Sequence, residues 1–151
     1  MSIFKNLIFI ITLFGASVQA EDELRSLSEV LAQEQSKHMT NYGYQRCSAL
    51  MMEMAQRTER GEKREGSEQL INFMSKGYEH FAIISAETIS DIKSRSASES
   101  SKSLSETLET ILKIQKMYFQ RMENEYLTSG NSLDANLLQD LNLCVRMFKG
   151  E

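Results

Sequence analysis

The chain has 151 residues, no proline, no tryptophan and a formal net charge of −4 at neutral pH. Its length suits one domain with one core, and its mild acidity, without a basic cluster, argues against a nucleic-acid or anionic-membrane partner. Leu, Glu, Met, Gln, Lys, Arg and Ala dominate, and valine is nearly absent after residue 20. These dominant residues lose little conformational freedom in a helix, so the composition predicts an all-α fold.

Residues 1–20 have the three-part order of a secretory signal peptide. The segment "MSIFKN" carries Lys5 as its only charge, and an apolar run from Leu7 to Ala16 follows it. The short residues Val18 and Ala20 then precede the acidic "EDE". Because this run is too short to span a bilayer, we expect cleavage after Ala20 rather than membrane anchoring. The expected product is one helical domain over residues 21–151, periplasmic or secreted, with no membrane partner.

The apolar spacing after the signal predicts four amphipathic helices that pack into a bundle, because a one-sided apolar stripe needs a partner to cover it. The expected helices cover about residues 22–60, 67–93, 104–128 and 132–149. Ser103 and Glu106 have the spacing of a capping box, and Asn131 or Ser132 is the expected cap of the last helix. The predicted inward residues of the last three helices are Leu70, Met74, Tyr78, Phe81, Ala82, Ile89, Ile92, then Leu104, Leu108, Ile111, Leu112, Tyr118, Phe119, Met122, Tyr126, then Leu137, Leu141, Cys144, Val145 and Phe148.

The long first helix carries two apolar faces about half a turn apart. One face would be formed near its start and the other after residue 46, so a straight helix cannot direct both into one core. Since Gly43 and its neighbours are poor helix formers, we expect a bend near Gly43. Alternatively the early face extends past the bundle and is a partner-binding surface. That candidate surface consists of Leu24, Leu27, Val30 and Leu31.

The segment "SRSASESSKSLS", Ser94 to Ser105, separates the second and third predicted helices. Seven of its twelve residues are serine, which gives it little apolar surface to bury. It is therefore expected to be a mobile connection or a frayed helix end.

The two cysteines of the chain, Cys47 and Cys144, fall on inward stripes of the first and last helices. Exported proteins meet an oxidising environment, and two is the smallest number of cysteines that can pair. The sequence therefore predicts a disulfide between them. A redox-active or nucleophilic role is not favoured, because there is no C-x-x-C motif and only His38 and His80 could assist.

A metal or haem site inside the bundle is the alternative that the sequence leaves open. Met51 and Met54 lie one turn apart and their thioethers suit Cu(I), while His80 lies beside an inward stripe and could ligate haem. Methionine more often fills a core, so we assign no cofactor and no metal. No hydrolase, phosphate-loop, zinc or EF-hand motif occurs, so the protein is not expected to be an enzyme.

The expected function is therefore binding to another protein, as an adaptor, inhibitor, immunity-type factor or small chaperone. The alternative is a small periplasmic copper or haem carrier that uses methionine and histidine. The sequence does not identify the partner.

Overall fold

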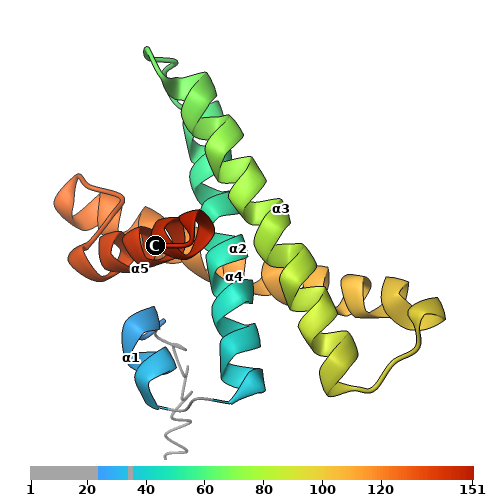
Figure 1. The fold of residues 1–151 in the computed structure, drawn as a ribbon. Helices are drawn as coiled ribbons and strands as arrows, with labels where there is room; N and C mark the ends of the chain where they lie inside the picture. The colour runs from blue at the N-terminus through green and yellow to red at the C-terminus, as the bar shows by residue number, and fades with distance from the viewer. Residues whose placement is uncertain (1–23, 34–35) are drawn as a thin grey trace, which may run out of the picture.

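The computed structural model describes residues 24–33 and 36–151, so the predicted signal peptide and its cleavage site lie outside the described residues. Every regular element within them is helical, which confirms the predicted all-α class. None of these helices is long and apolar enough to cross a membrane. The elements are α1 (Leu27–Gln33), α2 (Lys37–Arg60), α3 (Ser67–Ile92), a short 3-10 helix η1 (Ala97–Glu99), α4 (Ser100–Ser129) and α5 (Ala135–Lys149) (Figure 1).

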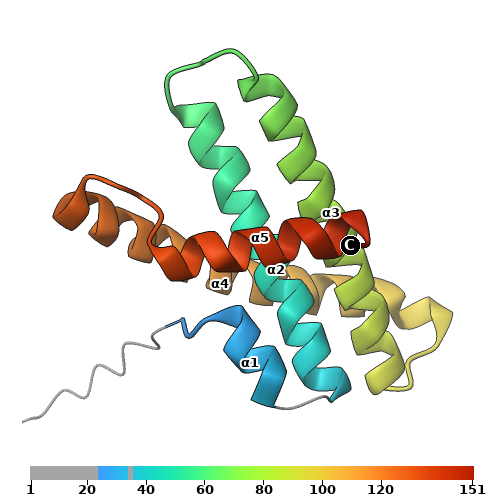
Figure 2. The same cartoon turned by 60° about the vertical axis from the view of Figure 1, so that its left-hand side comes forward.

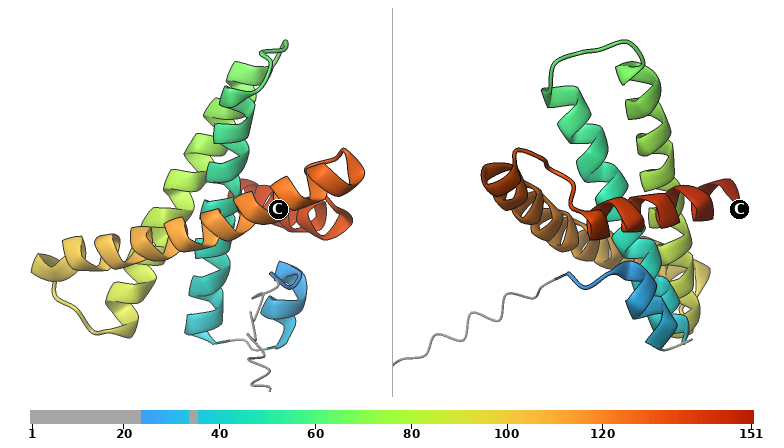
Figure 3. Two further views of the ribbon diagram at one scale, coloured as in Figure 1. Left: turned by 180° about the vertical axis from the view of Figure 1, so that it is seen from behind. Right: turned by 90° about the vertical axis from the view of Figure 1, so that its left-hand side faces the viewer.

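Helices α2 and α3 form a long antiparallel hairpin, and the other helices are arranged around it (Figure 1). Helix α4 crosses one face of the hairpin at a steep angle, and α5 returns across α2 on another side (Figures 2 and 3). The short α1 lies beside the first half of α2 (Figure 2). The predicted four-helix bundle is therefore not confirmed, because α4 and α5 cross the hairpin instead of running alongside it.

The predicted long first helix is two helices, and the chain does not bend at the expected residue. Helix α1 ends at Gln33 and α2 begins at Lys37, and α2 then continues through Gly43 (Figure 1). Gly43 is buried, and a Cβ atom on it would lie 3.0 Å from Cδ2 of Leu31. The glycine thus lets α1 approach α2 closely. A close contact between helices, rather than a kink, explains the poor helix former at this position.

The core is one cluster centred on α2, but the predicted stripe of α4 is only partly correct. The side of α4 that faces the hairpin includes two polar residues, Ser103 and Thr107, and Ile114, which the predicted stripe omits. Four residues of α4 predicted to point inward are exposed instead, Leu104, Leu112, Phe119 and Tyr126, and so is Leu70 of α3. Helix α4 has apolar residues over a wider arc than one crossing hairpin can cover, so part of that arc faces solvent. The buried apolar cluster contains Leu24, Leu27, Cys47, Ala49, Leu50, Met51, Ala55, Met74, Phe81, Ala82, Ile111, Ile114, Tyr118, Met122, Leu137, Leu141 and Cys144.

Of the two expectations for the serine-rich segment, a mobile connection or a frayed helix end, the structure is nearer to a helix end. The segment contains η1 and the first turns of α4, which begins four residues earlier than predicted. The capping box is formed by Ser96 and Glu99 at η1 rather than by Ser103 and Glu106. Ser103 is instead buried and its Oγ accepts a hydrogen bond from Arg95 Nη1 at 2.9 Å. Hydrogen bonds within the segment, from Arg95 to Ser103 and between Ser96 and Glu99, thus accompany this local structure, which its composition alone did not predict.

Helix α5 begins after Asp134, not after Asn131 or Ser132 as predicted. The Asp134 Oδ1 atom accepts a hydrogen bond from the backbone N–H of Leu137 at 2.7 Å. This contact satisfies one of the free N–H groups in the first turn of the helix.

Candidate functional site

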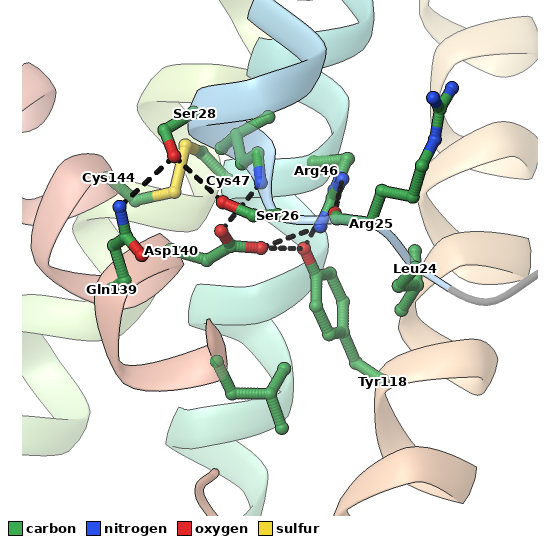
Figure 4. Close-up of polar contacts among 12 residues, drawn as sticks. Leu24, Arg25, Ser26, Ser28, Arg46, Cys47, Tyr118, Gln139, Asp140 and Cys144 are labelled. Carbon is green, nitrogen blue, oxygen red and sulfur yellow. Dashed lines mark hydrogen bonds and ion pairs between the residues drawn. A yellow bond between two sulfur atoms is a disulfide. The ribbon is translucent and has the colours of Figure 1, made fainter. Parts of the chain in front are cut away.

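The two cysteines lie at bonding distance inside the molecule. Cys47, in α2, and Cys144, in α5, are both fully buried, and their Sγ atoms are 2.05 Å apart (Figure 4). The two residues are 97 positions apart in the sequence. The disulfide therefore connects the hairpin directly to the last helix.

A buried polar cluster adjoins the disulfide and includes Arg46, which directly precedes Cys47, and Asp140, which lies four residues before Cys144. Arg46 Nη2 and Asp140 Oδ2 form an ion pair at 2.6 Å, and Arg46 Nε donates to the hydroxyl oxygen of Tyr118 at 2.9 Å (Figure 4). The cluster also holds the chain before α1. Asp140 Oδ1 accepts from the backbone N–H of Leu27 at 2.7 Å, and Arg46 Nη1 donates to the carbonyl oxygen of Arg25 at 2.6 Å. Asp140 of α5 thus caps the first turn of α1.

Burial is the largest influence on the pKa values of Asp140 and Tyr118 in this cluster. Burial raises the pKa of Asp140, while the N–H of Leu27 and the charge of Arg46 oppose that rise. Burial also raises the pKa of Tyr118 far above its ordinary value, so its hydroxyl keeps its proton. The side chains of Arg46 and Asp140 are only 1% and 3% exposed. Because these groups are enclosed and bonded to one another, the cluster fits a structural role rather than an acid–base site open to a substrate.

Arg121 of α4 provides a second contact to the segment before α1. Its Nε and Nη2 atoms donate to Asp134 Oδ2 at 2.9 and 2.7 Å, and its Nη1 atom donates to the carbonyl oxygen of Leu24. Partial burial alone would raise the pKa of Asp134, but the N–H of Leu137 and the Arg121 guanidinium lower it below its ordinary value. Side chains from α2, α4 and α5 therefore hold the segment that leads into α1.

The candidate partner surface at the start of the chain is not open in this structure. Leu24, Leu27 and Val30 are buried, and Leu31 packs against the core cluster. This face is covered because α1 folds back on α2 and α5 instead of extending past them.

The residues of the alternative metal or haem site lie in different environments. Met51 is fully buried in α2, and its Sδ fills the space at Gly77, where a Cβ would lie 2.2 Å away. Met54 is only partly buried. His80 is exposed, and its ring packs against Phe148 with a centroid distance of 5.3 Å. Met51 and His80 thus have packing roles, which gives no structural support for a shared ligand site.

A second buried charge lies where α4 crosses α2. Glu53 is fully buried, and it accepts a hydrogen bond from Gln115 of α4 at 2.7 Å. Its Oε1 atom forms ion pairs with Arg57 at 2.9 Å and with Arg60 at 3.3 Å. The guanidinium groups of these two arginines lie 5.5 and 5.7 Å from the ring centroid of Phe119. These contacts explain how a half-exposed aromatic ring on α4 is held in place.

The best candidate for a binding surface is a groove between the end of α3 and the start of α4. Its volume is about 390 Å³, and its apolar residues include Ile83, which is 54% exposed, and Leu104, which is 40% exposed. Large exposed apolar side chains gathered in a hollow are typical of interaction sites. The groove is lined by Ile83, Ala86, Glu87, Ser90, Asp91, Ser100, Ser101 and Leu104. We refer to these eight residues as the α3–α4 groove.

The buried polar cluster was not predicted from the sequence, although the sequence places both of its charged residues near a cysteine. Arg46 directly precedes Cys47, and Asp140 lies four residues before Cys144, so each charge is close to an inward-facing cysteine. Asp140, one helical turn from Cys144, therefore falls on the inward side of the last helix. Ile83 carried no comparable signal, since only the crossing of α3 and α4 makes it part of a groove.

Comparison with known proteins gives no family for this chain. No family model matches it, and no curated protein and no solved structure matches it. Function therefore has to be inferred from the groove, the disulfide and the charge distribution.

Proposed function

We propose that this protein is exported to the periplasm or secreted, and that it acts by binding another protein through the α3–α4 groove. The N-terminal signal pattern and the buried Cys47–Cys144 pair support an oxidising compartment. Its role would be that of an adaptor, inhibitor, immunity-type factor or small chaperone.

The observation that carries this proposal is the exposure of Ile83 and Leu104 on the two walls of one groove. Each side chain leaves a large apolar surface in solvent that a bound partner would cover. The rest of the chain supplies a rigid support, because the disulfide and the buried pair of Arg46 and Asp140 fix α5 and α1 to the hairpin.

The proposal is tested by purifying the tagged protein from its native compartment and identifying the proteins that accompany it. We expect a reproducible companion that is lost in the double variant Ile83→Glu/Leu104→Glu. The matched control is Leu138→Glu on α5, because Leu138 is 48% exposed and lies outside the groove. Circular dichroism and thermal unfolding check that all variants fold.

The possible outcomes separate the two functional classes. A companion that remains bound to the double variant, or is lost equally in the Leu138→Glu control, would contradict the groove as the binding surface. The absorption spectrum and metal content of the same preparation test the carrier alternative. Stoichiometric copper or haem that disappears when Met51, Met54 or His80 is replaced would overturn the proposal.

A further inference from the structure

We infer that the partner segment that fits the α3–α4 groove is an amphipathic helix whose apolar face is flanked by lysine or arginine. This inference rests on the proposed function and specifies the chemistry of the partner. It is carried by the charges at the groove together with the helical nature of both walls.

The charge of the groove comes from Glu87 and Asp91 on α3, both exposed. Within the described part of the chain, neither carboxylate lies within ion-pair distance of a basic side chain. The nearest basic residues along the chain, Lys93 and Arg95, are both paired with Glu106, at 2.6 and 2.8 Å. The groove therefore presents unneutralised negative charge beside apolar surface, and a partner with positive charge at its flank complements it.

One basic residue does approach from the other side of Asp91. Lys37 and Asp91 both line a neighbouring hollow with a volume of about 340 Å³, but they do not form an ion pair. Glu87 does not line that hollow. Lys37 thus approaches this negative charge without an ion pair to it, and the exposed Lys102 follows the groove residue Ser101 on α4.

The helical walls determine which kind of backbone can bind. Along α3 and α4 the backbone groups are paired within the helices, and at the end of α3 the carbonyl groups of Ile89, Ser90 and Asp91 accept from the following turn. The groove therefore offers no strand edge to an extended peptide. A helix satisfies its own backbone groups and presents side chains at positions i, i+3, i+4 and i+7. Apolar side chains at these positions can cover Ile83, Ala86 and Leu104, while flanking cations reach the carboxylates.

The walls are also held at a fixed angle, which favours a preformed groove. Arg95, in the link between the walls, donates to Ser103 Oγ and to Glu106 of α4. Ser96 and Glu99 close the capping box at η1. A groove that is ordered before binding loses less conformational entropy when a partner docks.

The test uses a short synthetic amphipathic peptide of leucine and lysine, and a counterpart in which glutamate replaces every lysine. Both are titrated into the isotopically labelled, oxidised protein, and backbone amide shifts are followed by NMR. We expect the leucine–lysine peptide to bind, with the largest shifts around Ile83 and Leu104, and the leucine–glutamate peptide not to bind. Binding should weaken as salt is added, because the carboxylates are exposed to solvent.

Charge reversal on the protein supplies the matched comparison. The variant Glu87→Lys/Asp91→Lys should weaken binding by at least about tenfold. The control is Glu62→Lys/Glu65→Lys, in the exposed link between α2 and α3, which changes the net charge equally. Equal weakening in both variants, equal binding of the two peptides, shifts confined to another surface or no binding at all would each overturn the inference.

Failure of this inference can be told apart from failure of the proposed function. If no peptide binds but the native companion is still lost in Ile83→Glu/Leu104→Glu, the groove remains the binding surface and only the basic helix is wrong. If the companion is insensitive to that double variant, the proposed function itself fails.

Discussion

The junction of α1, α2 and α5 and the corner between α3 and α4 are both held by arginine–carboxylate pairs, but in opposite surroundings. At the junction, the side chains of Arg46 and Asp140 are 1% and 3% exposed, and the disulfide lies beside them. At the corner, the side chains of Glu106 and Lys93 are 34% and 48% exposed, although that of Arg95 is only 9% exposed. The same chemistry is therefore enclosed in one region and hydrated in the other.

This difference indicates a division of roles between the two regions. A buried pair that loses one partner leaves an uncompensated charge in the interior, so the junction is expected to be sensitive to single substitutions. An exposed pair is screened by water and salt, so the corner orients its helices without dominating stability. The junction supports the fold, and the corner is left with an open groove.

The largest expected effect at the junction comes from removing the disulfide. The variant Cys47→Ala/Cys144→Ala frees a loop of 97 positions, and the chain-entropy model gives a loss of about 4.7 kcal/mol for a loop on the order of 100 residues. Urea unfolding of the oxidised wild type, the reduced wild type and the variant measures this loss. If the reduced protein and the variant unfold at the same urea concentration as the oxidised protein, the junction does not depend on the bridge.

Removal of the buried carboxylate should have the next largest effect. Asp140→Ala leaves Arg46 without its counter-charge and α1 without its cap, so we expect a loss of about 3–5 kcal/mol in the free energy of unfolding. The matched substitution at the corner is Glu106→Ala, which should cost much less because that carboxylate is hydrated. Equal losses in urea unfolding of the two variants would contradict the proposed difference between the regions.

A smaller and more local effect is expected from Arg121→Ala. This substitution removes the donor to the carbonyl oxygen of Leu24 and the partner of Asp134, which should cost about 1–3 kcal/mol. Amide hydrogen exchange should become faster in α1 and in the first turn of α5, while exchange at the corner stays unchanged. Unchanged protection of α1 would show that Arg121 does not hold the N-terminal segment.

The smallest effect concerns the titration of Glu106 at the corner between α3 and α4. Hydrogen bonds from Arg95 and then Lys93 lower the pKa of Glu106 from 4.5 to about 2. Since the folded pKa lies below the unfolded one, the stabilising contribution is fully present above pH 4.5 and is lost as the pH falls toward 2. Carbon NMR of the carboxyl group measures this pKa directly, and Arg95→Gln should return it toward 4.5. An unchanged pKa in that variant would assign the shift to another cause.

Helical periodicity predicted the inward direction correctly for some residues and wrongly for others. The cysteines were placed on inward faces by helical periodicity, and the structure brings them together. The same periodicity placed Leu104 and Phe119 inward, yet they are 40% and 36% exposed. Periodicity identifies an apolar arc on a helix, but the crossing angle of the neighbouring helices decides which part of that arc is covered.

Glycine at position 43 gives a second example. Its low helix propensity suggested a bend, whereas the structure uses the missing side chain for contact with Leu31. Propensity records what a residue does in isolation. A glycine that allows two helices to approach closely therefore looks the same in the sequence as a glycine that breaks a helix.

By itself, the sequence determined the helical class, the boundaries of α3 to within a residue and the inward direction of both cysteines, because these follow from local propensity and spacing. Only the tertiary structure decided that α4 crosses the hairpin, that Asp140 caps α1, and that Ile83 and Leu104 face one groove. These features join residues far apart along the chain. Their geometry depends on how helices pack against one another, which short-range sequence patterns do not specify.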